Sequence, residues 1–324
     1  AYEIRNCDWS SDVCSSDLCA DEPLHGDPNG LEQIRPLREH EKLERLLRDY
    51  AAFIERHANA GGYRHGVLAW VVFVGSIAAA TAILFQLLNA ISPLLGLVWS
   101  IGVLYLAMGI RRFIDQFTEI QQLLRTGDLT AARECLVRWR GGGSGDLGEE
   151  DLARAAIEQG LLASHRRVFG IMAWFIVLGP AGAVIYRVAD VLEELWGQPA
   201  DSDRETFGQF AAQAFYWVDW IPARLTAAGL AVVGNFEDAV YCWRVQADAW
   251  RPRTDAIILA SGAGALGVRL GGTSQGEAGE VRPELGTGAR ADVEDMPDAV
   301  GLVWKALVLW MLAILVVSVA HALG

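Results

Sequence analysis

Long apolar stretches separated by charged segments are the dominant pattern of this sequence. A helix that crosses the hydrocarbon core of a bilayer needs about 20 consecutive, mostly apolar residues. One such stretch differs from the others because Asp219, Pro222 and Arg224 lie near its middle. The pattern predicts an all-α polytopic membrane protein with about five transmembrane or re-entrant helices. These helices are expected at residues 65–86, 91–110, 168–186, 211–234 and 302–323.

The distribution of basic residues predicts which loops lie in the cytoplasm. Residues 19–64 contain seven Arg or Lys and residues 111–167 contain nine, whereas residues 188–213 contain one. Loops that stay in the cytoplasm accumulate positive charge. We therefore expect two large cytoplasmic helical loops, at residues 111–167 and 235–301, and a C-terminus outside. The protein is expected to be a multi-pass protein of the bacterial inner membrane.

The first of these loops has the periodicity of helices. Apolar residues recur at three- and four-residue spacing from Ile110 to Leu124, which is typical of a helix with one apolar face. Asp128 stands where a following helix would begin and can cap it. We interpret the glycine run at residues 141–145 as a linker. Residues 149–162 then resume a helix with an acidic first turn.

Composition and the first residues of the chain narrow the classes of function. The chain has 324 residues, 52% of them hydrophobic, and 40 Asp or Glu against 27 Lys or Arg, so a basic nucleic-acid surface is not expected. Residues 8–18 lack periodicity and resemble the translation of a sequencing adapter. We interpret residues 1–30 as artefactual or disordered and residues 31–324 as one integral membrane domain. Discounting that run leaves Cys135 and Cys242, too few for a metal or redox site.

The polar residues of the fourth apolar stretch form a first candidate site. An ionisable group such as Asp219 is costly at membrane depth, and is tolerated mainly when it is paired or faces a polar cavity. Pro222 frees a backbone carbonyl one turn earlier. A proline kink could bring Asp219 and Arg224 together. The alternative is an interfacial segment in which Arg224 reaches the lipid headgroups.

A second polar cluster flanks the third apolar stretch. Ser164, His165, Arg166 and Arg167 precede this stretch, and Tyr186, Arg187 and Asp190 follow it. In a through-going span the two groups lie on opposite sides of the membrane. A re-entrant turn at residues 179–182 would instead let all of them line one pocket. The simpler interpretation of the first group is a basic anchor at the cytoplasmic face.

An ordered set of short motifs resembles the CobD/CbiB membrane proteins of cobalamin biosynthesis. The more specific motifs are Ile-Pro-Ala-Arg-Leu-Thr at residues 221–226 and Ala-Leu-Gly-Val-Arg-Leu-Gly-Gly at residues 265–272. Shorter similarities occur at residues 127–133, 154–158 and 185–192. The resemblance covers residues 31–322, and all of these motifs occur in the family's order.

The resemblance implies an adenosylcobinamide-phosphate synthase, an enzyme that uses ATP to join an aminopropanol unit to a carboxylate of adenosylcobyric acid. Mg²⁺ would accompany the ATP, and the partners would be a corrinoid substrate and the lipid bilayer. The oligomeric state and the metal ligands stay open. The catalytic candidates are Glu158, Asp190 and Asp219. The candidates for binding substrate or phosphate are His165, Arg187, Arg224, Gly262, Gly264 and Arg269.

The chain departs from the family's pattern at two elements. After the glutamate that matches Glu158, the family usually carries Glu-Asn-x-x-Asp, whereas residues 162–167 read Leu-Ala-Ser-His-Arg-Arg. Residues 249–253 read Ala-Trp-Arg-Pro-Arg in place of a Ser-Pro-Asn segment. The alternative is therefore a non-enzymatic, AmpE-like inner-membrane signalling protein linked to β-lactamase induction. The Asp-Trp-Ile-Pro-Ala-Arg-Leu motif at residues 219–225 is similar to that group.

Overall fold

The computed structural model describes residues 37–58, 62–140, 147–197, 202–249, 253–272 and 282–323. The segment predicted to be artefactual or disordered, residues 1–30, and the glycine run at 141–145 lie outside these ranges. The arrangement set out below is that of one unit, residues 40–324.

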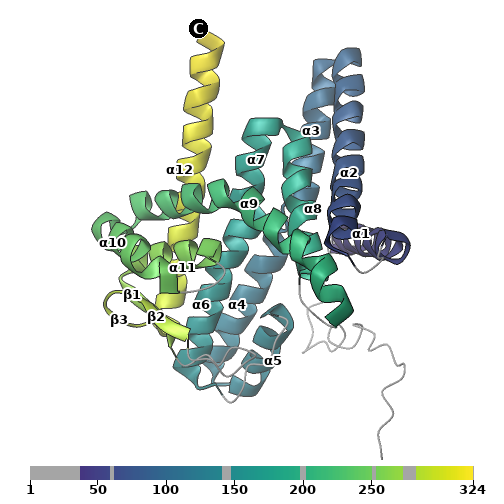
Figure 1. Ribbon diagram of the computed structural model, residues 1–324. Coiled ribbons are helices and arrows are strands. Elements are labelled where there is room, and N and C mark those ends of the chain that lie inside the picture. Colours follow the sequence, from purple (N-terminus) through teal and green to yellow (C-terminus); the bar gives the residue numbers. More distant parts are fainter. Residues whose placement is uncertain are drawn as a thin grey trace, which may run out of the picture. The chain divides into compact units, whose positions relative to one another are not determined.

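Within the described residues, three helical segments are long and apolar enough to cross a membrane: Tyr63–Ile91, Glu149–Leu178 and Val293–Val316. The first is helix α2 (Tyr63–Ile91) and the third belongs mainly to α12 (Met296–Leu323). The middle segment is a continuous rod of α6 (Glu149–Ser164), η1 (His165–Phe169) and α7 (Gly170–Leu178). A shorter apolar helix, α3 (Pro93–Ala107), packs beside α2 (Figure 1). Helices form in all five predicted segments, but the count of five spans is not confirmed.

Large apolar side chains are exposed on these same helices. Leu68 and Ile83 of α2, Val98 of α3, Val177 at the end of α7 and Leu312 of α12 are each more than half exposed. Exposed apolar side chains in such number are unfavourable in water and are expected where a protein meets lipid. The exposure therefore points to a membrane location.

The third apolar stretch is a hairpin and not a single span. Helix α7 ends at Leu178, and α8 (Pro180–Trp196) returns alongside it (Figure 1). The chain reverses at Gly179, whose φ of 65° and ψ of −150° are accessible essentially to glycine alone. Pro180 then begins the next helix, a position that suits its fixed φ. The stretch predicted at residues 168–186 is therefore two helices joined by a turn at Gly179, at the first of the residues where the re-entrant alternative expected it.

A long helix, α9 (Ser202–Val233), runs across the hairpin and α12 rather than alongside them (Figure 1). It contacts α2, α8, α11 (Arg253–Leu266) and α12. Because α9 contains the segment predicted as a fourth span, this crossing direction is the main difference from the predicted arrangement. The remaining helices are α1 (Leu37–Ala58), α4 (Ile110–Thr126), α5 (Leu129–Arg140), α10 (Phe236–Gln246), η2 (Ala247–Ala249) and η3 (Val293–Asp295).

The helices predicted in the first charged loop are confirmed as α4, α5 and α6. Asp128 caps α5, because its Oδ1 accepts a hydrogen bond from the Ala131 amide at 3.1 Å. The apolar face of α4 contributes Phe117, Ile120 and Leu124 to the largest buried core, which also includes residues of α6, α9, α10, α11 and α12. This core holds the rod, α9 and α11 in fixed relation around the polar residues described below.

A small sheet follows α11 and was not predicted. Its strands are β1 (Val268–Gly272), β2 (Arg282–Gly286) and β3 (Ala289–Arg290), in the order β2-β1-β3. Strand β1 is antiparallel to β2, with Leu270 opposite Leu285, and parallel to β3. Both leucines are fully buried and belong to the main core. The all-α prediction therefore holds for the membrane-type helices and misses this sheet.

Candidate functional site

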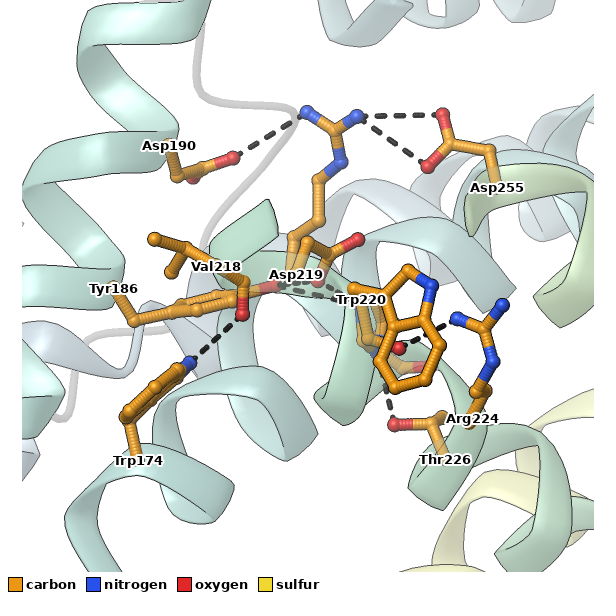
Figure 2. Close-up of polar contacts among 12 residues, drawn as sticks. Trp174, Tyr186, Asp190, Val218, Asp219, Trp220, Arg224, Thr226 and Asp255 are labelled. Carbon is orange, nitrogen blue, oxygen red and sulfur yellow. Dashed lines mark hydrogen bonds and ion pairs between the residues drawn. The ribbon is translucent and has the colours of Figure 1, made fainter. Parts of the chain in front are cut away.

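A buried polar cluster lies where the rod, α8 and α9 meet (Figure 2). The rod changes to a π-helix over His165–Phe169 at this point. Such one-turn widenings of a helix occur frequently at functional sites. His165 and Arg166, the first two residues of the wide turn, carry the polar side chains of the rod into the cluster.

The innermost part of the cluster joins His165, Tyr186 and Asp219. The Nε2 of His165 lies 2.7 Å from Oδ1 of Asp219, and the Tyr186 hydroxyl donates to the same oxygen at 2.8 Å. The other ring nitrogen of His165, Nδ1, lies 2.9 Å from the hydroxyl of Thr226. All three central side chains are 0% exposed. Asp219 is thus paired with residues of the hairpin, and the predicted pairing with Arg224 is not found.

Two local features allow the hairpin and α9 to approach this closely. The Tyr186 ring lies directly against the backbone of Gly170, where any β-carbon would overlap it. Pro222 lacks an amide hydrogen, so the helix offers no donor to the carbonyl of Val218 four residues earlier. The indole of Trp174 in α7 donates to that carbonyl at 3.0 Å (Figure 2). The predicted effect of the proline is therefore confirmed, and the freed carbonyl fastens α7 to α9.

The second part of the cluster is centred on the guanidinium of Arg166. Three carboxylates from two helices surround it: Asp190 at 3.4 Å, Glu193 at 3.2 Å and Asp255 at 3.3 Å. The Arg166 side chain is 24% exposed and its guanidinium also lies 5.1 Å from the centre of the Phe215 ring. Arg166 is therefore an internal counter-ion to acids of α8 and α11, which is a different role from the predicted basic anchor.

Arg187 and Asp190 form a further ion pair of this region, at 2.7 Å on one face of α8. Both side chains are at most 10% exposed. The hairpin brings Asp190 within 3.4 Å of Arg166, so the two polar groups that flank this stretch in the sequence lie in one cluster. Among the predicted site residues, the structure therefore brings together His165, Arg187, Asp190 and Asp219.

The other predicted residues lie elsewhere. Glu158, which is 3% exposed, accepts a hydrogen bond from the Gly271 amide at 2.7 Å, and Arg154 donates to the Gly271 carbonyl at 3.0 Å. These two side chains of α6 therefore hold strand β1 in place through hydrogen bonds to its backbone. Gly262 and Gly264 are buried in α11, where a β-carbon would collide with Leu161 or with the backbone at Asp238 and Ala239.

The last two predicted residues are arginines with exposed surface. The guanidinium of Arg224 lies 3.8 Å from the centre of the Trp220 ring, and its Nη1 donates to the Trp220 carbonyl at 2.8 Å. Arg269 lies on β1 with its side chain 42% exposed and pairs with Glu284 at 3.1 Å. A hydrogen bond from Arg290 lowers the pKa of the Glu284 carboxyl below its ordinary value, and Arg269 acts in the same direction.

Sequence reasoning missed several members of the cluster. Glu193 and Asp255 were not candidates, although an acid on an apolar helix is a signal that an opposite charge lies nearby. Thr226 was noted only as the last residue of the Ile-Pro-Ala-Arg-Leu-Thr motif. Neither the hydrogen bond of Thr226 nor the ion pairs of Arg166 follow from sequence spacing, because their partners lie up to 89 residues away.

The cluster does not fit the Mg²⁺ and ATP that the resemblance implies. Carboxylate oxygens are the ligands that Mg²⁺ prefers, but here the three converging carboxylates are all paired with the Arg166 guanidinium, which lies between them. Within the described ranges, no group of three or more His, Cys, Asp or Glu side chains is arranged to hold a metal ion. Gly262 and Gly264, which would approach a phosphate, instead pack against protein.

The family model and the relatives that match this chain point to the same family. The family model described as CobD/Cbib protein matches residues 20–303. A Stutzerimonas stutzeri protein named "Cobalamin biosynthesis protein CobD" is 36% identical over 268 residues, which are 81% of this chain and 86% of the relative. A protein of the same name from Chromobacterium violaceum is 36% identical, over 71% of this chain and 75% of the relative. The Mycobacterium tuberculosis relative is 29% identical over 74% and 79%, respectively. No solved structure matches.

Proposed function

This chain belongs to the CobD/CbiB family, and we propose that it acts in cobalamin biosynthesis at the bacterial inner membrane. The reaction proposed is the ATP-dependent joining of an aminopropanol unit to a carboxylate of adenosylcobyric acid, in which an amide bond forms as the activated carboxylate oxygen leaves. The observation that carries this proposal is the family match over residues 20–303, together with relatives named for cobalamin biosynthesis at 36% identity. The AmpE-like alternative is not favoured by these comparisons.

The geometry assigns different roles to the buried and the exposed candidates. A side chain with no exposed surface cannot touch a substrate in this conformation. His165 and Asp219 are both 0% exposed, so in this proposal they are positioning residues that join the hairpin to α9. Glu158 is likewise a positioning residue, because it holds β1 through the Gly271 amide.

Among the predicted residues, Arg224 and Arg269 are best placed to bind a corrinoid, because both have exposed surface. Guanidinium groups bind carboxylate and phosphate in a bidentate manner and keep their charge throughout the physiological range. Arg224 presents its guanidinium on the surface of α9, and Arg269 on β1. We assign no step to ATP or Mg²⁺, because Arg166 occupies the centre of the carboxylates that would hold the metal.

The test is complementation of a bacterial strain that cannot make adenosylcobinamide phosphate. The full chain is expressed and its membrane insertion is verified by fractionation. Cobalamin-dependent growth without added cobinamide supports the proposal. If the strain contains the inserted protein but grows only when cobinamide is added, the proposal is wrong.

Variants then separate contact from positioning. Arg224→Gln and Arg269→Gln should reduce growth while the protein accumulates normally, and Arg64→Gln, which removes a charge from the exposed start of α2, should not. Asp219→Asn should act differently, because it weakens a buried network. We expect lower accumulation or a lower unfolding midpoint, in parallel with any loss of growth. Loss of growth with unchanged thermal stability would contradict the positioning role of Asp219.

A further inference from the structure

A cavity of about 210 Å³ lies between α1, α2, α3 and α8, next to the polar cluster. Most of its wall is aliphatic and includes Ile77, Val103 and Leu106. The same helices α2 and α3 carry the exposed apolar side chains that point to lipid contact. The cavity is therefore a hollow in the apolar part of the protein, and its natural occupant has an apolar chain.

Two arginines line the cavity. They are Arg167 and Arg187, and a β-carbon added at Gly109, another lining residue, would lie 3.7 Å from Nη1 of Arg167. The Arg187 guanidinium is held in place by Asp190 at 2.7 Å. Two guanidinium groups at the edge of an apolar hollow are a favourable setting for an anionic headgroup, and phosphate is the group whose geometry they match best.

Trp99 also lines the cavity. Its indole nitrogen is buried and has no hydrogen-bond partner within the described residues. An unsatisfied buried donor costs about 1–3 kcal/mol, so a ligand oxygen within reach of this nitrogen would be favoured. The cavity wall therefore includes an indole donor without a protein acceptor as well as the two arginines.

The volume limits the kind of ligand. Clefts that enclose a drug-sized molecule have volumes of about 300–1,000 Å³. This cavity is smaller, so it can enclose a headgroup and part of one acyl chain, and it excludes both a corrin ring and a whole diacyl lipid.

From these observations we propose that the cavity binds one anionic phospholipid, enclosing its headgroup and part of one acyl chain. The phosphate lies against Arg167 and Arg187, an acyl chain lies against the aliphatic wall, and an ester oxygen accepts from the Trp99 indole. The bound lipid would fill the space between the α2–α3 pair and the hairpin. This inference does not depend on the proposed reaction, because it concerns a different set of side chains.

Native mass spectrometry of the full chain, released from neutral detergent micelles that contain phosphatidylglycerol, tests the proposal. One tightly retained phosphatidylglycerol per chain is expected. Diacylglycerol, which has the chains without the phosphate, and glycerol phosphate, which has the phosphate without the chains, should be retained far less. Equal retention of diacylglycerol would show that the arginines are not used. Retention of glycerol phosphate alone would show a plain anion site. Either result overturns the proposal.

Variants locate the lipid. Arg167→Gln and Trp99→Phe should each weaken retention about tenfold or more, which is the expected effect of losing one such hydrogen bond. Arg64→Gln and Trp217→Phe, at exposed positions outside the cavity, are the matched controls and should retain lipid normally. Val103→Phe fills the cavity and should exclude the lipid while the protein stays folded. Normal retention in Val103→Phe and Arg167→Gln would overturn the proposal.

Discussion

Replacing Arg166 by alanine tests whether the three acids around it depend on its charge. The substitution leaves the carboxylates of Asp190, Glu193 and Asp255 without the guanidinium that lies 3.2–3.4 Å from each of them. Removing one partner of a fully buried ion pair costs about 3–5 kcal/mol. Because Arg166 and Glu193 are 24% and 27% exposed, water screens part of this interaction. We therefore expect a loss of about 2–4 kcal/mol.

A matched control removes an exposed arginine that pairs with the same helix. Arg48 lies 3.9 Å from Glu194, and both side chains are more than half exposed. Such pairs contribute about 0–1 kcal/mol. The measurement is the thermal unfolding midpoint of the purified protein in detergent, followed by tryptophan fluorescence. Arg166→Ala should lower the midpoint by several degrees and Arg48→Ala by about 2 °C at most.

A double variant distinguishes lost charge from lost packing. If uncompensated negative charge is the cause, neutralising one acid in the Arg166→Ala protein by Asp255→Asn should restore part of the midpoint, although it removes a second native group. If Arg166→Ala costs no more than Arg48→Ala, or if Asp255→Asn lowers the midpoint further, then Arg166 is not an internal counter-ion, and our reason for excluding Mg²⁺ fails with it.

Three further results are expected. Gly179→Ala should destabilise the hairpin by about 1–3 kcal/mol, because its backbone angles suit glycine alone, whereas Gly75→Ala in α2, where a β-carbon meets open space, should leave the unfolding midpoint unchanged or raise it. Burial raises the pKa of Cys135 to about 11, so its thiolate fraction at pH 8 is only about one in a thousand. A thiol reagent should therefore label Cys135 slowly in the folded protein, and rapid labelling would contradict this environment. The pKa of Glu284 is lowered mainly by Arg290, so the ionised Glu284 stabilises the fold at pH values above its ordinary pKa of 4.5, and this stabilisation is lost as the pH falls below that value. Glu284→Gln should remove this contribution from the acid unfolding curve. An acid unfolding curve identical to that of the unchanged protein would refute the prediction.

Patterns that depend on near neighbours in the sequence predicted structure well. The amphipathic period of α4, the Asp128 cap of α5 and the acidic start of α6 each involve residues within one or two helical turns. The freed carbonyl at Val218 also followed from the chemistry of Pro222 alone. These features were predictable because their energies are set locally.

Features that depend on distant partners were not predictable in the same way. The sequence around Gly179 allowed both a crossing and a turn, and the choice depends on Tyr186 packing on Gly170 and bonding to Asp219. Positive charge at Arg166 is equally compatible with headgroups and with buried acids. Strand β1 was missed because its glycine-rich sequence has no strand-like alternation, and it is fixed from outside by Glu158.

The reversal at Gly179 also decides which side chains α8 presents to the rod. Because α8 runs back alongside α7, Asp190 and Glu193 come within 3.4 Å and 3.2 Å of Arg166. If the turn were straightened into one continuous helix, both acids would be carried away from Arg166 along the helix axis, by about 1.5 Å per residue. The backbone freedom of one glycine therefore sets the charge balance of the buried cluster.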